Sequence, residues 1–294
     1  MKSNWKEALH AWFKTETALV KEVRKVEYRD VDLSAHLCES MFYDQDFVFD
    51  LSRTESHLVR DSGLSGRRTL SSAVQSLIKL HDPSRVQRLP VAAFHGIASS
   101  KSHGCRSLEE LAYRLKPPCE YPSSNLIRFE TEEDFRRNIA EVEREFSNRG
   151  VVALYREWDG KLFVRNGDMS HHLAAIYRQC KEQGRQYYLD LRVQVLGIDP
   201  SNCRFILDNS YPLIIQEQSR YQLCRILERF GIEWHSSSLS KELSILYVLK
   251  SNKRAEAAYG EIAHVGSDKF FDLKKYLEEL LLSCGTAPYY PKAG

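Results

Sequence analysis

The feature that most constrains the fold is a pair of β-prone runs separated only by the dipeptide Asp159-Gly160. Residues 151–158 and 161–165 are rich in β-branched and aromatic side chains, which favour strands. An Asp-Gly pair supplies the positive φ that a tight hairpin turn needs. The sequence therefore predicts an antiparallel hairpin in the middle of the chain.

A helix and another strand are predicted after this hairpin. Apolar side chains recur at three- and four-residue spacing from Leu173 to Cys180, and Gly184 ends the pattern. Residues 189–196 then alternate between apolar and polar side chains, as strands do. The unit predicts an α+β fold, a mixed and partly antiparallel sheet with flanking helices, built around residues 148–250.

The turn between the hairpin and this helix concentrates polar side chains. Asp168 or Ser170 is expected to cap the helix, whose free N–H groups and dipole favour an anion such as phosphate. A carboxylate can activate a water molecule, and an imidazole can protonate a leaving group or stabilise a phosphate oxygen. The predicted catalytic residues are Asp168, His171, His172 and Asn166, and the predicted phosphate-binding residues here are Gly167, Ser170 and Arg165.

The same region resembles the nucleotide-binding core of the ParB/sulfiredoxin superfamily. Gly167 is similar to the turn glycine of its Gly-x-His-Arg motif, His171 to the motif histidine, and Leu173-Ala174-Ala175 to the helix that follows. The resemblance covers about fifty residues, and here the turn is longer and His172 stands where the family usually has Arg. It implies a ParB/sulfiredoxin-like core that contacts nucleotide phosphates, in proteins that act as CTP switches on DNA, sulfinic reductases or nucleases.

Two further loops carry candidate phosphate-binding residues. Arg67 and Arg68 follow a Gly/Ser-rich turn that opens onto a helix predicted from the apolar spacing of residues 70–80, although an exposed surface loop is the simpler interpretation. Lys101 and His103 follow a short strand, predicted over 89–96, that ends at His95. We expect that loop to meet the Asp168 turn. A metal site at His95, His103 and Cys105 is disfavoured because paired ligand spacing is missing, so no metal and no cofactor is predicted.

Three other helices and one strand have clear patterns. The stretch from Thr131 to Arg149 is predicted to be a helix with Thr131 and Asp134 in capping positions. Helices are also predicted over residues 5–26, 216–230 and 270–282, and a strand over 245–249.

Composition limits the class of protein. Lys plus Arg number 42 and Asp plus Glu number 40, so nucleic-acid binding must come from local patches and not from a global positive charge. The cysteines number seven, an odd count without paired spacing, which indicates reduced thiols in a cytoplasm. No apolar stretch reaches the roughly 20 residues that a membrane span requires, so we expect a cytoplasmic protein without a membrane partner.

Three prolines in residues 117–122 indicate a soft boundary, because they prevent a continuous helix. A helical and loop-rich region over 1–122, packed on an α+β core domain over 123–294, is therefore predicted, although a single domain is also compatible with the length. The oligomeric state is not predictable.

Three functions remain open. The first is a hydrolase of nucleic acid or nucleotides, either a nuclease or a DNA glycosylase, as would suit defence against foreign DNA; in a glycosylase, Asp168 would stabilise a sugar cation and the flipped base would stack on an aromatic side chain. The second is a non-catalytic, nucleotide-gated DNA-binding module. The third is a structural or partner-binding protein in which Asp168 is only part of a capped turn.

Overall fold

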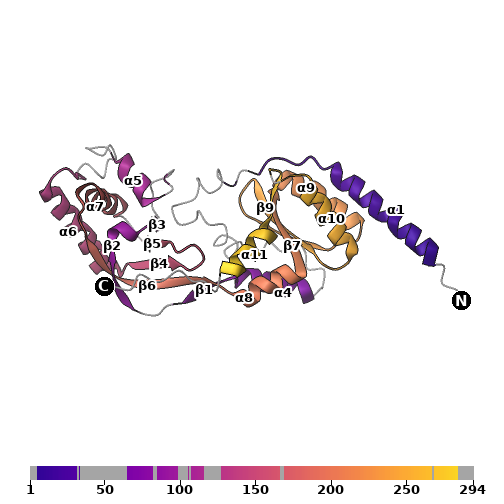
Figure 1. Cartoon of the computed structure of the whole chain (residues 1–294), viewed down its shortest axis with the longest axis horizontal. Helices are drawn as coiled ribbons and strands as arrows, with labels where there is room; N and C mark the ends of the chain where they lie inside the picture. Colours follow the sequence, from indigo (N-terminus) through magenta and orange to yellow (C-terminus); the bar gives the residue numbers. More distant parts are fainter. Residues whose placement is uncertain are drawn as a thin grey trace. The chain divides into compact units, whose positions relative to one another are not determined.

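The computed structural model describes residues 5–31, 33, 65–81, 85–98, 105, 107–115, 127–165, 169–266 and 268–283 (Figure 1). These residues form two compact units. The four-stranded unit contains the described residues of 5–33, 65–77 and 199–282, and the six-stranded unit contains those of 78–198. Each unit has its own sheet and its own hydrophobic core.

The six-stranded unit contains the predicted hairpin, helix and strand. Its elements are β1 (Ile78–His81), β2 (Val86–Pro90), a 3-10 turn (Val91–Ala93), β3 (Gly96–Ala98), α5 (Leu108–Arg114), α6 (Glu132–Arg149), β4 (Val152–Arg156), β5 (Leu162–Arg165), α7 (Ser170–Gln183) and β6 (Tyr188–Ile198). The hairpin prediction is confirmed: β4 and β5 are antiparallel, and Gly160 has a φ of 67°. The carboxylate of Asp159 closes the turn by accepting from the N–H of Lys161 at 3.0 Å.

The sheet is mixed, with strand order β1-β6-β4-β5-β3 and with β2 also paired to β6. β6 runs parallel to β4 and antiparallel to β1 and β2, whereas β3 runs parallel to β5. The predicted mixed, partly antiparallel sheet with flanking helices is therefore confirmed.

The two faces of this sheet differ because side chains alternate along each strand. Leu189, Leu191 and Val193 of β6 are buried in a core with α5, α6 and α7, and these helices cover that face (Figure 1). The opposite face carries Arg88, Arg156, Arg165 and Arg192, and we name it the arginine face. Cross-strand partners share a face, so the pairings of Arg88 with Asp190, of Arg192 with Val152 and of Val152 with Arg165 define it.

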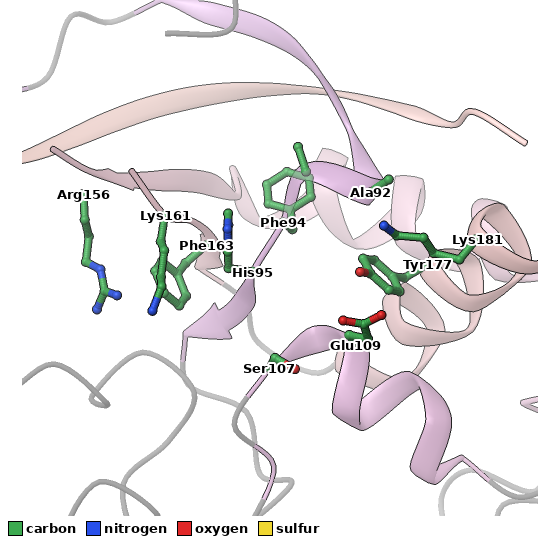
Figure 2. Close-up of a pocket in the computed structure, with 11 residues that line it drawn as sticks. Ala92, Phe94, His95, Ser107, Glu109, Arg156, Lys161, Phe163, Tyr177 and Lys181 are labelled. Atoms are coloured by element: carbon green, nitrogen blue, oxygen red, sulfur yellow. The ribbon is translucent and has the colours of Figure 1, made fainter. Parts of the chain in front are cut away.

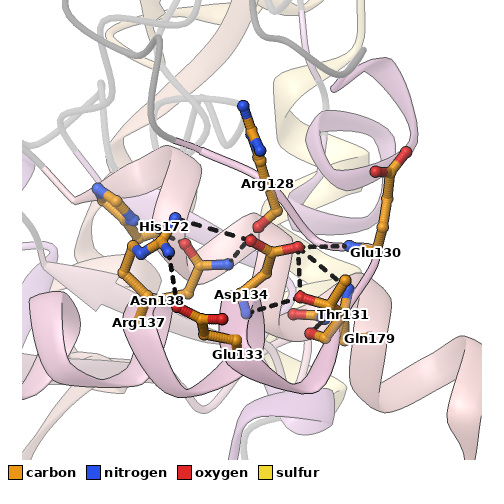
Figure 3. A network of polar contacts seen from close by, with 9 residues as sticks. All are labelled: Arg128, Glu130, Thr131, Glu133, Asp134, Arg137, Asn138, His172 and Gln179. Atoms are coloured by element: carbon orange, nitrogen blue, oxygen red, sulfur yellow. Dashed lines mark hydrogen bonds and ion pairs between the residues drawn. The ribbon is translucent and has the colours of Figure 1, made fainter.

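The start of α6 is held by the predicted capping box. The side chain of Thr131 accepts from the N–H of Asp134 at 3.1 Å, and the carboxylate of Asp134 accepts from the N–H of Thr131 at 3.1 Å (Figure 3). Burial opposes ionisation of Asp134, but hydrogen bonds from Thr131 and from the N–H of Glu130 outweigh it and hold the pKa of Asp134 below its usual range.

The four-stranded unit contains α1 (Trp5–Arg24), α4 (Ser65–Gln75), α8 (Pro200–Asn209), β7 (Ser210–Gln216), α9 (Glu217–Arg229), β8 (Trp234–Ser238), β9 (Leu243–Leu249), α10 (Lys253–His264), β10 (Phe270–Phe271) and α11 (Leu273–Ser283). Its sheet has the order β10-β7-β9-β8 and is antiparallel throughout. The helices predicted over 5–26 and 216–230 and the strand over 245–249 are confirmed. The helix predicted over 270–282 begins only at Leu273, because Phe270 and Phe271 pair with β7.

Two short predictions are wrong, the first because a distant strand pairs with the residues and the second because a 3-10 turn interrupts the strand. The helix predicted to continue through Leu80 ends at Gln75, because Ile78–His81 pair with β6. The strand predicted over 89–96 stops at Pro90, where a 3-10 turn begins, and His95 precedes β3.

The two units divide the chain differently from the predicted boundary at residue 122, since β1–β3 share a sheet with β4–β6. The proline-rich segment itself lies outside the described residues. Within the described part of the chain, no helix combines the length and apolar character needed to cross a bilayer.

Replacing Asp134 with Ala should destabilise the protein by roughly 1–3 kcal/mol, because partly buried donors at the start of α6 lose their acceptor. Urea unfolding followed by circular dichroism measures this. Glu133→Ala, which removes an exposed carboxylate from the same turn, is the matched control and should cost less than about 0.5 kcal/mol. Equal losses in both variants would contradict the structural role of the capping box.

Candidate functional site

The described part of the predicted turn is the start of α7. Its N-cap is Met169, which is buried in the core and accepts no hydrogen bond from the helix through its side chain. Ser170 is the first helical residue, so the prediction that Ser170 caps the helix is wrong; burial of a methionine holds the helix start instead. Asn166, Gly167 and Asp168 lie outside the described residues.

His172 is oriented by a buried asparagine of α6. Asn138 is 1% exposed and donates from Nδ2 to the carbonyl oxygen of Arg128 at 2.7 Å, and its Oδ1 lies 2.9 Å from Nδ1 of His172 (Figure 3). Because the amide N–H is directed to Arg128, Oδ1 is the acceptor and Nδ1 of His172 carries the proton. Nε2 of His172 then keeps its lone pair, which is the state of the ring that takes up a proton.

A second contact between the same helices fixes their register. Gln179, two turns after His172, donates from Nε2 to the carbonyl oxygen of Thr131 at 3.1 Å. His172 thus contacts Asn138 while Gln179 contacts Thr131, seven residues away on each helix, which requires antiparallel packing. The orientation of His172 is therefore tied to the capping box of α6.

Burial lowers the pKa of both imidazoles below the ordinary value of 6.5. For His172, the positive charge of Arg144 and the neighbouring His171 lower the pKa further, whereas Glu141 raises it. Both rings are therefore mainly neutral at pH 7. A neutral ring can accept a proton. The alternative role, binding phosphate as a cation, requires a protonated ring.

The strand register places side by side the two residues that precede the predicted polar segments. β3 and β5 are parallel, and Ala98 pairs with Arg165. These residues immediately precede segment 99–104, which contains Lys101 and His103, and segment 166–168, and both segments lie outside the described residues. The two segments therefore start from adjacent strand ends.

Arg165 is not brought together with His172. Arg165 is exposed on the arginine face, whereas α7 packs on the helix-covered face, so the sheet separates the two side chains.

Arg67 and Arg68 lie in the four-stranded unit. They are part of α4, which begins at Ser65, so the expectation of a Gly/Ser-rich loop at these two residues is wrong. Their side chains lie outside the description.

Metal ligands are not assembled in the described part of the chain, where no three His, Cys, Asp or Glu side chains are grouped around a common point. Cys105 is buried, and burial raises the pKa of its thiol. The other described cysteines, Cys180, Cys203 and Cys224, are also buried and reduced.

A pocket that was not predicted lies where the hairpin, His95 and α7 meet. Its volume is about 350 Å³. It is lined by Ala92, Ala93, Phe94, His95, Ser107, Glu109, Arg156, Lys161, Phe163, Tyr177 and Lys181 (Figure 2). Arg156, Lys161 and Phe163 stand together on one side, and Glu109, Tyr177 and Lys181 face them from α5 and α7 (Figure 2).

Arg156 gives one wall of this pocket a rigid positive group. Its side chain is 3% exposed and forms a two-point ion pair with Asp159, in which Nε donates at 3.2 Å. Its guanidinium lies 4.5 Å from the ring centre of Phe163 and 5.7 Å from that of Trp158. Aromatic rings and a bidentate carboxylate together restrict the guanidinium to one position.

His95 links three parts of this site. Its backbone N–H donates to the carbonyl oxygen of Leu162 at 2.8 Å, its carbonyl accepts from the N–H of Leu108 at 2.8 Å, and its Nδ1 accepts from the N–H of Leu162 at 3.2 Å. Burial, Lys161 and Arg156 lower the pKa of His95, against the opposing effects of Asp159 and the Ala93 carbonyl. His95 is therefore mainly a neutral ring with its proton on Nε2.

The free energy of unfolding should depend on pH through the protonation of His172. The folded pKa is below 6.5, so the unfolded chain binds the proton more tightly, and the free energy of unfolding should fall as the pH decreases below about 6.5. His172→Gln, which keeps a donor for Asn138, should lose less stability between pH 7.5 and pH 5.5 in urea unfolding. His264→Gln, at an exposed position on α10, is the matched control. If wild type and His172→Gln lost the same free energy of unfolding between pH 7.5 and pH 5.5, the lowered pKa of His172 would be refuted.

One comparison with known proteins gives a match. A model described as "Family of unknown function (DUF6685)" matches residues 85–285, about two thirds of the chain and most of both units. No curated protein and no solved structure shows a significant match. The matched range includes His172, Asn138 and every residue that lines the pocket. The chain therefore belongs to the DUF6685 family, whose function is unknown.

Proposed function

We propose that this protein is a hydrolase of nucleic acid or nucleotides, with its site at the common end of β3 and β5. The observation that carries the proposal is the pairing of Ala98 with Arg165, from which the two polar segments start side by side. Ligands commonly bind where loops leave the carboxyl ends of parallel strands beside a helix N-terminus. Asp168, Asn166, Lys101 and His103 belong to those segments.

His172 supplies the base in this proposal. Its Nδ1–H is held by Asn138, and its Nε2 is left to accept a proton from water. Asp168 either activates the same water or stabilises the positive sugar that forms when a base departs. Phosphate charge beside His172 is met by Lys101, because the histidines are neutral at pH 7 and Arg165 lies on the opposite face of the sheet. Phosphodiester cleavage and base excision both remain compatible with these groups.

The test is incubation of wild type, Asp168→Asn and His172→Gln with plain and modified DNA, single- and double-stranded, followed by separation of the products before and after alkali. Each variant should lose at least 100-fold in rate, because His172 takes up a proton and Asp168 activates the water or stabilises the sugar cation. Breaks without alkali identify a nuclease, and breaks only after alkali identify a glycosylase. His264→Gln should retain the wild-type rate. Absence of any product with wild type would end the proposal for DNA.

The pH profile of the same reaction distinguishes a base from a structural histidine. The rate should rise through the pKa of His172, below 6.5, and be constant above it. Asn138→Asp places a carboxylate next to Nδ1 and should shift the rise to higher pH. Gln183→Glu, which adds a carboxylate at an exposed position of α7, should leave it unchanged. A profile that is unaffected by Asn138→Asp would exclude His172 as the base.

A second function, non-catalytic binding of nucleotides, is favoured by the pocket in Figure 2. Its volume is in the range of small-ligand sites, and the exposed Lys161 and Lys181 line it from opposite sides (Figure 2). Glu109 disfavours an anion at the α5 side, so the phosphate end of a ligand belongs near Lys161.

Replacement of both Lys161 and Lys181 with Ala should weaken binding of nucleoside mono- or triphosphates at least tenfold in calorimetry, because two cations are lost from the pocket. Lys275→Ala, an exposed position in the four-stranded unit, should bind as wild type does. Binding of nucleoside phosphates without cleavage of any DNA would support the non-catalytic nucleotide-binding function over the hydrolase. Unchanged binding in the double variant would exclude this pocket as the nucleotide site.

A further inference from the structure

We infer that the arginine face of the six-stranded sheet binds single-stranded nucleic acid. This inference rests on the proposed function for the position of the cleaved bond, but binding itself can be measured without cleavage. It starts from the exposed strand residues of β2, β6 and β5.

The register aligns these residues in rows across the sheet. Val86 of β2 pairs with Arg192 of β6, Arg192 with Val152 of β4, and Val152 with Arg165 of β5. Neighbouring strands are about 4.8 Å apart, so Arg192 and Arg165 are roughly 10 Å apart in one row. Arg88 lies in the next exposed row, opposite Asp190.

Charge on this face favours a polyanion. Arg88, Arg165 and Arg192 are exposed, and Asp190 is the one acidic side chain among the described strand residues of the face. The whole chain has a net charge of only +2, so this local excess is a patch and not a reflection of composition. Arginine is the residue best suited to phosphate, because its planar group donates two parallel hydrogen bonds.

An aromatic side chain in the same patch favours single strands over duplexes. The guanidinium of Arg88 lies over the ring of Tyr188, 5.2 Å from its centre, and Tyr188 is 37% exposed. Exposed bases stack on aromatic rings and on guanidinium planes, as they do on other sheet platforms. Bases in a duplex are already stacked on each other and offer no free ring face.

The patch leads to the proposed site. Arg165 is the last residue of β5, and segment 166–168, which includes Asp168, follows it directly in the chain. A strand held by Arg88, Arg192 and Arg165 therefore reaches the end of β5, from which the segment that contains Asp168 starts. Single-stranded nucleic acid is the substrate form that this arrangement selects.

The test measures fluorescence anisotropy of a labelled 20-nucleotide single strand and of its duplex between 50 and 300 mM salt. Wild type should bind the single strand at least tenfold more tightly. The double variant Arg88→Ala/Arg192→Ala should lose at least tenfold in affinity, and the slope of log affinity against log salt should fall by about 0.7 for each arginine. Tyr188→Ala should weaken binding roughly 5- to 150-fold, and Tyr188→Phe should restore it.

Arg136→Ala/Arg144→Ala is the matched control, since it removes two exposed arginines from α6 on the other side of the sheet. It should leave affinity and salt slope unchanged. Arg88→Lys/Arg192→Lys retains the charge and should keep most of the salt slope. The inference would be overturned if duplex and single strand bound equally, or if the Ala double variant bound as wild type does. It would also be overturned if polyglutamate displaced the strand at the same concentration as unlabelled oligonucleotide.

The outcomes separate this inference from the proposed hydrolase. If the single strand binds as expected but is not cleaved, the inference about the arginine face is supported and the proposed hydrolase is excluded. If Arg88→Ala/Arg192→Ala cleaves and binds the strand as wild type does, the proposed hydrolase is supported and the arginine face is excluded as its substrate-binding surface.

Discussion

The alternation of side chains along β6 is the constraint on which the six-stranded unit depends. This 11-residue strand pairs with β1, β2 and β4, and Leu189, Leu191, Val193 and Val195 point to the face covered by α5, α6 and α7. A shift of one residue would move Leu189, Leu191 and Val193 to solvent and bury Arg192 instead, so the register has no close competitor. The charged residues of β2 and β6 share the other face for the same reason.

Elements defined by neighbouring residues were predictable from the sequence. The hairpin follows from Asp159-Gly160, because the turn needs only those residues and the strands beside them. The capping box of α6 and the end of α7 at Gly184 follow from equally local chemistry, and both are confirmed. The α+β class follows from the order of such elements.

The candidate site was less predictable, because its geometry depends on contacts between distant residues. His172 is oriented by Asn138 across two helices, and His95 is fixed by Leu162, 67 residues away. Nothing near Lys161 or Lys181 in the sequence distinguishes them from ordinary surface lysines. Ile78–His81 continue a helical apolar pattern but form a strand, since β6 provides partners that no local pattern reveals.

The hydrogen bonds between α6 and α7 connect the orientation of His172 to the residues that begin α6. His172 and Asn138 belong to the same pair of helices as Gln179 and Thr131, and Thr131 begins α6 through its capping box. Linkage between binding and folding is reciprocal. A ligand that holds Nε2 of His172 in its present orientation would therefore also stabilise the first turns of α6. Fraying of those turns would weaken the binding of that ligand by the same free energy.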